Sequence, residues 1–169
     1  NVLVGGDIAS FDLGLNKNSN FKIDINPTAA WFIQNNIAVG AYASLGLDIV
    51  KGSTTTTYGV GALGRYYLGS NQVNTESVLK HTRAFVEGNV GIGGQNTPGG
   101  STTNGLNLGI GPGIAYFITP NIALETLLKY NGIVGFGNDP LNSRLKLGVG
   151  FQIYLPGRST ANKVMNDAK

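Results

Sequence analysis

The sequence predicts an all-β fold, an eight-stranded, antiparallel, up-and-down transmembrane β-barrel. Three observations predict it. Apolar and polar residues alternate with period two through most of the 169-residue chain. Charged residues stay off the apolar faces of the expected strands, and glycine is abundant on the opposite faces. Aromatic residues gather toward the ends of the apolar faces.

Each expected strand is an alternating run of residues. In residues 21–32, for example, Ile25 and Trp31 share one face, whereas Lys22 and Asp24 lie on the other. Runs of this kind have the spacing of a β-strand with one apolar face. The eight expected strands cover residues 2–11, 21–32, 37–49, 57–68, 83–93, 106–116, 122–131 and 144–155.

These strands form one barrel domain over residues 1–155, followed by a polar tail over residues 156–169. The first strand is the least regular. Val4 and Ile8 share one parity, whereas Phe11 takes the other. A β-bulge or a strand end would explain such a switch, so one of these two irregularities is expected in this strand.

An internal repeat relates the second and third strands to the sixth and seventh. The run INPTAAWFIQNNIAVG from Ile25 aligns with IGPGIAYFITPNIALE from Ile110. Both runs read as a strand, an aromatic pair, a tight turn and a strand. Pro27 and Pro112 occupy equivalent positions, where each would remove one hydrogen bond from the ladder. A tolerated bulge or kink is the favoured interpretation, and a lateral gap for a lipid tail is the alternative.

Period two does not say which face of the barrel points outward, because soluble and membrane barrels share it. Charge placement favours a lipid-facing apolar surface, since one Arg or Lys at the bilayer midplane costs about 2–4 kcal/mol. Glycine on the polar faces favours the same orientation, because a narrow lumen needs small residues. The polar faces carry all of the strand charges: Asp7, Lys22, Asp24, Asp48, Arg65, Arg83, Glu87, Glu125, Lys129, Arg144 and Lys146.

The aromatic residues on the apolar faces predict two girdles. Girdles at both membrane interfaces are typical of outer-membrane barrels. Ordinary core aromatics are the alternative interpretation, and would belong to a soluble, lipocalin-like barrel. The expected girdle residues are Phe21, Trp31, Tyr58, Tyr66, Tyr116 and Tyr130.

Several runs of the chain resemble the small outer-membrane barrels of the OmpA/OmpX type from Gram-negative bacteria. The resemblance covers residues 2–155 and is carried by the run that begins at Ile110 and by FVEGNVG from Phe85. It implies a bacterial outer-membrane location with both termini periplasmic. The last strand is similar to the family's assembly signal, which the barrel-assembly machinery reads: Lys146, Gly148, Phe151 and Ile153. Two departures from the family are expected: the barrel does not end on an aromatic residue, and a peptidoglycan-binding domain is not expected after it.

Inward charges of both signs predict a structural network of ion pairs in the lumen, because an unpaired buried charge is costly. An open aqueous pore is the alternative, but eight strands enclose little more than the space of their own side chains. The expected network consists of Lys22, Asp24, Asp48, Arg65, Arg83, Glu87, Glu125, Lys129, Arg144 and Lys146.

The composition argues against an enzyme and against a cofactor or metal. The chain has no cysteine, which excludes disulfides, thiol nucleophiles and cysteine zinc sites. His81 is the single histidine and is expected beside a periplasmic turn, away from catalytic machinery. Glu87 and Glu125 could act as an acid–base pair, although ion pairing explains them more simply. The net charge of +3 is small and scattered, so no nucleic-acid partner is expected.

We therefore expect a structural or interaction role, as a scaffold or an accessory subunit of a larger envelope complex. Small outward residues would let another barrel approach: Ala41, Ala43, Ala62, Gly64 and Gly88. Lys17, Lys22 and Lys51 are candidates for contact with lipopolysaccharide head groups or for ordinary snorkelling. A transporter or pore for small solutes or lipids, and a soluble lipocalin-like binder, stay open as alternatives.

Overall fold

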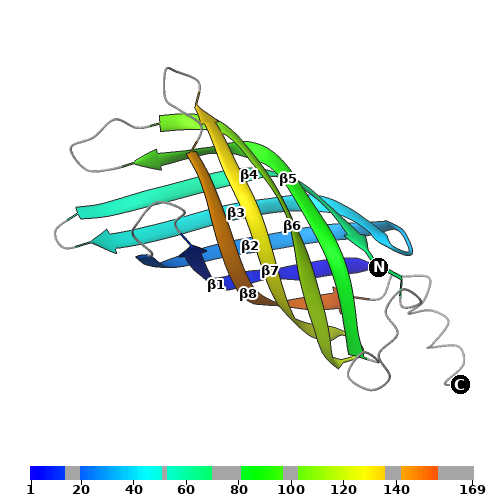
Figure 1. Cartoon of the computed structure of the whole chain (residues 1–169). Coiled ribbons are helices and arrows are strands. Elements are labelled where there is room, and N and C mark those ends of the chain that lie inside the picture. Colours follow the sequence, from blue (N-terminus) through cyan, green and yellow to red (C-terminus); the bar gives the residue numbers. More distant parts are fainter. Residues whose placement is uncertain (14–19, 51–52, 70–80, 97–102, 136–141, 156–169) are drawn as a thin grey trace, which may run out of the picture.

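A computed structural model describes residues 1–13, 20–50, 53–69, 81–96, 103–135 and 142–155 (Figure 1). The expected polar tail, Lys17 and Lys51 lie outside the described residues. None of the described residues forms a helix long and apolar enough to cross a membrane. The strands are β1 (Val2–Leu13), β2 (Asn20–Gln34), β3 (Ile37–Val50), β4 (Ser53–Tyr67), β5 (Thr82–Asn96), β6 (Thr103–Thr119), β7 (Ile122–Gly135) and β8 (Asn142–Leu155).

The eight strands form a closed, up-and-down barrel, which confirms the predicted fold. Neighbouring strands pair antiparallel in chain order, and β1 closes the barrel against β8. Closure leaves no free sheet edge. Val2 pairs with Leu155, so β1 begins and β8 ends at the same end of the barrel. We call this the terminal end, and the other the opposite end.

The internal repeat is also a structural repeat. Two-residue turns at the terminal end join β2 to β3 and β6 to β7. The register shifts just before each turn, between Phe32 and Gln34 in β2 and between Phe117 and Thr119 in β6. In the second turn, the Thr119 hydroxyl accepts a hydrogen bond from the Ile122 backbone N–H at 3.0 Å. Equivalent residues therefore end both strands in the same way.

The structure locates three features that the sequence singled out: the parity switch in β1, Pro27 and Pro112. The register of β1 against β8 shifts between Asp7 and Ala9, which confirms the expected bulge. Pro27 lies in β2 opposite Gly6, and Pro112 lies in β6 opposite Val86. Past each proline the ladder on the other side resumes in an unchanged register. Both prolines are thus tolerated in the ladder without a bulge at that position.

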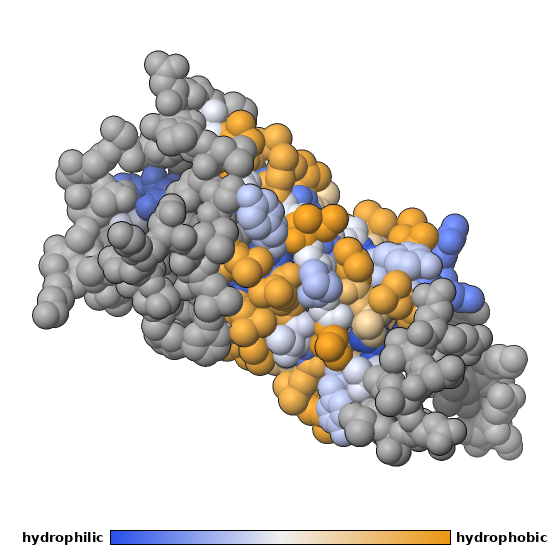
Figure 2. Space-filling view, viewed as in Figure 1, coloured by the Kyte–Doolittle hydropathy of each residue, from blue (hydrophilic) through white to orange (hydrophobic). Residues whose placement is uncertain are grey.

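Apolar side chains face outward, as the charge placement predicts. Ile110 and Trp31 expose 61% and 56% of their surface, whereas Arg65 and Glu87 expose 3% and 2%. In Figure 2 apolar residues cover most of the visible middle of the barrel. A dry soluble core would bury these side chains, so the soluble, lipocalin-like alternative does not fit the structure.

The strands are longer than the 9–11 residues expected for a bilayer crossing. They run from 12 residues in β1 to 17 in β6. The expected runs counted only residues in the apolar alternation, but ladder hydrogen bonds do not need an apolar side chain. β4 illustrates this, because it begins with the polar segment STTTT, whose residues pair with the end of β3.

Candidate functional site in the lumen

Aromatic side chains fill the lumen toward the terminal end. Tyr67 and Phe85 are almost completely buried, and their ring centroids lie 5.6 Å apart. Phe32 stacks on Tyr67, and Phe117 packs 5.0 Å from Tyr154. Together these five residues form what we call the aromatic plug. Alternation predicts inward positions for them, but their contact with one another depends on how the strands are staggered around the barrel.

One glycine makes room for the plug. Gly113 lies opposite Phe85 in the β5–β6 ladder, and a Cβ added there would collide with the Phe85 ring. Gly113 is buried and belongs to the glycine-rich inner face of β6. This close approach explains why the inner face of β6 is rich in glycine here: the bulky side chain comes from the neighbouring strand.

Arg65 lies at the centre of a buried ion-pair network directly beside the plug. Its Nε and Nη2 donate to Glu87 Oε2 at 3.0 and 2.6 Å. Its Nη1 donates to both oxygens of Glu125 at 2.9 and 2.8 Å. The guanidinium also lies 4.1 Å from the centroid of the Phe85 ring. Charge pairing, hydrogen bonding and a cation–π contact thus fix this side chain together.

Neighbouring groups complete the network. Lys129 forms an ion pair with the second oxygen of Glu87. The Tyr154 hydroxyl donates to Glu125 Oε1 at 2.9 Å, and lies 2.8 Å from the Tyr67 hydroxyl. One arginine, one lysine and two glutamates give a formally neutral set. Their mutual contacts offset the large desolvation cost of burying four charges.

The other predicted network residues fall into three groups. Lys146 binds Asp24 at 2.8 Å, nearer the opposite end. Arg83 donates instead to Asn36 at 3.2 Å, and its guanidinium lies 4.8 Å from the Tyr67 ring centroid. Three side chains lie outside the described residues: Lys22, Asp48 and Arg144.

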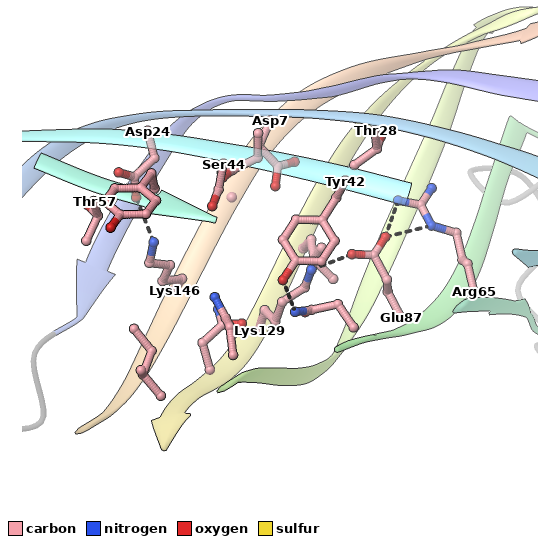
Figure 3. A pocket seen from close by; sticks show the side chains of 18 of the residues that line it. Asp7, Asp24, Thr28, Tyr42, Ser44, Thr57, Arg65, Glu87, Lys129 and Lys146 are labelled. Atoms are coloured by element: carbon pink, nitrogen blue, oxygen red, sulfur yellow. Dashed lines mark hydrogen bonds and ion pairs between the residues drawn. The ribbon is translucent and has the colours of Figure 1, made fainter. Parts of the chain in front are cut away.

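Beyond the network, toward the opposite end, the lumen holds a polar cavity of about 110 Å³ (Figure 3). We call it the lumen cavity. Asp7, Tyr42 and Lys129 are among its lining residues. A water molecule needs about 10–15 Å³ of such space, so several waters fit. The lining offers ligand-binding groups, both carboxylates and amides.

The outward aromatic residues form two groups. Trp31, Tyr66 and Tyr116 lie toward the terminal end, whereas Tyr58 and Tyr130 lie toward the opposite end. Eight residues separate Tyr58 from Tyr66 along β4. At about 3.3 Å per residue and a tilt of about 40°, that spacing is about 20 Å along the barrel axis, near the height of an apolar membrane band. The Phe21 side chain lies outside the described residues.

The residues of the predicted assembly signal divide between the two faces of β8. Lys146 and Gly148 face the lumen, whereas Phe151 exposes 40% of its surface on the outside. Ile153 lies on the outward face two residues further along. The apolar half of the motif therefore faces outward. Recognition of the motif by the barrel-assembly machinery stays a prediction.

His81 lies at the surface, in a short turn directly before β5. Glu87 and Glu125 are both engaged by Arg65. Both carboxylates of the candidate acid–base pair are therefore held in ion pairs. Among the described residues, no group of three or more His, Asp or Glu side chains is placed to hold a metal ion.

Comparison with solved structures identifies the architecture. The chain superposes on Neisserial surface protein A with a TM-score of 0.71 at 18% identity, covering 91% of this chain and 97% of that one. The fold is that of a small outer-membrane β-barrel. The N-terminal β-barrel domain of Pseudomonas aeruginosa OprF, another outer-membrane barrel, matches with a TM-score of 0.53 at 16% identity. That match covers 90% of this chain and 96% of the domain.

No protein-family model matches the sequence, and no curated protein matches it. The similarity is therefore one of fold. Period-two alternation is shared by outer-membrane β-barrels because the bilayer imposes it, while the identity of individual residues is free to drift.

Proposed function

We propose that this chain is an integral protein of a bacterial outer membrane with a structural or interaction role, packing against another barrel as an accessory subunit. The observation that carries the proposal is an outward face of small side chains across β2–β5. We call it the small-residue face, and its members are Ala29, Ala41, Ala43, Ala62, Gly64 and Gly88.

The small-residue face is continuous across the strands. Ala41 pairs with Ala29 on one side and with Ala62 on the other, and Gly64 pairs with Gly88. A Cβ added at Gly64 would meet no atom within 4 Å, so the surface is recessed there. Small residues let backbones approach closely where helices pack in membranes. We extend that reasoning to barrel walls.

Large apolar side chains surround the small-residue face. They project from β6, β7 and β8, as at Ile114 and Phe151, and also border the face on β3 and β5, as at Leu45 and Ile92. Flexible lipid tails fill the gaps between side chains of any shape, so contact with lipid does not require a patch of small residues. The patch favours a rigid partner with its own wall, such as another transmembrane barrel, at the small-residue face.

The plugged lumen supports a role outside transport. The aromatic plug and the network around Arg65 fill the lumen toward the terminal end. We propose no catalytic activity, because Glu87 and Glu125, the candidate acid–base pair, are held in ion pairs. We also propose periplasmic termini, insertion by the barrel-assembly machinery, and contact of the outer surface with membrane lipid and lipopolysaccharide.

Copurification tests the proposal. The native membrane is dissolved into polymer-bounded nanodiscs without detergent, and proteins retained with the tagged chain are identified by mass spectrometry. We expect a second barrel, or a second copy of this chain, to be retained. Ala62→Trp should lose it, because the indole blocks close approach.

The matched control places the same bulk on the far side of the barrel. Thr126 is exposed on the outside of β7, four strands from β3 in the closed order. Thr126→Trp should retain the partner. A chain that stays monomeric and copurifies with nothing would exclude the accessory-subunit role, and so would equal loss in both variants.

A further inference from the structure

The lumen cavity contains hydrogen-bond acceptors for which the described residues supply no donor. Asn89 Oδ1, Asn107 Oδ1 and Gln152 Oε1 are buried without a hydrogen-bond partner among the described residues. All three side chains line the cavity. Gln152 exposes 2% of its surface, and its amide nitrogen is already used to donate to Thr28 at 3.2 Å. Leaving a buried acceptor unpaired destabilises the fold, so a donor from outside the protein is expected.

Asp7 adds a fourth acceptor, and it carries charge. Its half-buried carboxylate lines the cavity next to the β1 bulge. The cations that line the cavity are already bound to other carboxylates: Arg65 and Lys129 to Glu87, and Lys146 to Asp24. Figure 3 draws these pairs as dashed lines and draws none to Asp7. No hydrogen bond or ion pair joins Asp7 to another of the described side chains, which leaves its carboxylate available to a ligand.

The acceptors lie on opposing parts of the wall. Asp7 and Gln152 come from the adjacent strands β1 and β8, whereas Asn89 and Asn107 come from the adjacent strands β5 and β6. In the closed order of eight strands, β5 lies across the lumen from β1. A single metal ion binds oxygen atoms within about 2.0–2.6 Å, so it would serve one wall at a time. A ligand that pairs with both groups therefore carries several donor groups set apart from one another.

We propose that the lumen cavity binds a small organic cation, a protonated aliphatic amine, whose N–H groups donate to these acceptors while Asp7 supplies the opposite charge. Ammonium groups are pure donors and carry the charge that complements Asp7. The cavity volume of about 110 Å³ limits the ligand to a small molecule. This inference does not depend on the proposed subunit role.

Calorimetric titration of the full chain in lipid nanodiscs tests the proposal with three probes. 1,4-Diaminobutane has charge and N–H donors, tetramethylammonium has charge without donors, and urea has donors without charge. We expect saturable binding of 1,4-diaminobutane, with the other two at least about tenfold weaker, because charge-assisted hydrogen bonds contribute about 1.5–3 kcal/mol.

Two variants locate the site, and a third variant is the control. Asp7→Asn should weaken 1,4-diaminobutane binding at least about tenfold, because a charged acceptor is lost. Asn107→Ala should weaken it about fivefold, because a neutral acceptor is lost. Tyr130→Phe changes one hydroxyl on the outer surface and should bind as the wild type does. No saturable binding, equal binding of urea, or unchanged binding by both lumen variants would overturn the proposal, leaving water as the occupant.

Discussion

Replacing Arg65 by methionine removes the centre of the buried network while keeping an unbranched side chain of similar length. Four hydrogen bonds to Glu87 and Glu125 are lost at once. Glu87 keeps its ion pair with Lys129, but Glu125 is left with the Tyr154 hydroxyl as its remaining hydrogen-bond donor. Glu125 exposes 2% of its surface, so water does not replace the missing partner.

Breaking a buried pair by removing one partner costs about 3–5 kcal/mol, and this is the loss in unfolding free energy expected for Arg65→Met. Lys146→Met is the matched control, since it breaks the ion pair with Asp24 near the opposite end. The Lys146 side chain exposes 28% of its surface, against 2% for Arg65. The Asp24 carboxylate is itself buried at 3% exposure, but it loses one hydrogen bond from Lys146, whereas Arg65→Met removes four. Water also reaches the partly exposed Lys146 side of the pair, so the control should cost less than Arg65→Met.

The assay is urea-dependent unfolding of the chain in lipid vesicles. Trp31 is the single tryptophan and faces outward, so its fluorescence reports transfer between lipid and water. The double variant Arg65→Met/Glu125→Leu should recover part of the loss, because the uncompensated carboxylate is gone. If Arg65→Met costs no more than Lys146→Met, the network is not a stabilising centre and the reasoning is wrong.

Three further predictions follow from the same structure. Gly113→Ala should cost about 1–3 kcal/mol, since its Cβ collides with the buried Phe85 ring, whereas Gly64→Ala, with open space, should be nearly neutral in the same unfolding assay. The purified chain should give no stepwise conductance in planar bilayers, and discrete current steps would show that the aromatic plug does not seal the lumen. Trp31 should be quenched more by shallow than by deep lipid-attached quenchers; the opposite order would remove it from an interfacial girdle.

The fold could be predicted from the sequence because the bilayer imposes a local rule. Outward residues such as Ile110 are mostly apolar because they face lipid, whereas inward residues such as Glu87 need not be. The alternation can therefore be followed in each strand separately. The repeat from Ile25 and Ile110 predicted equivalent turns because matching residues end the two strands. A local pattern was enough for both.

The partners in the lumen could be predicted only in part. Arg65 and Glu87 are directly opposite each other in the β4–β5 ladder, so neighbouring strands bring them together. Glu125 and Lys129 come from β7, and their contact with this pair depends on the stagger of the whole barrel. Alternation does not encode that stagger. Alternation predicted the inward position of Arg83, but it does not predict the hydrogen bond from Arg83 to Asn36.

The central claim is that apolar side chains meet lipid while polar side chains line the lumen. The chain has no cysteine, so single-cysteine variants along β7 can carry a spin label without background. With the barrel in bilayers, labels at Leu124, Thr126 and Leu128 should collide often with dissolved oxygen, and labels at Lys129 and Asn131 rarely. Collision frequencies that fail to alternate along β7, or that alternate with the opposite phase, would contradict the account.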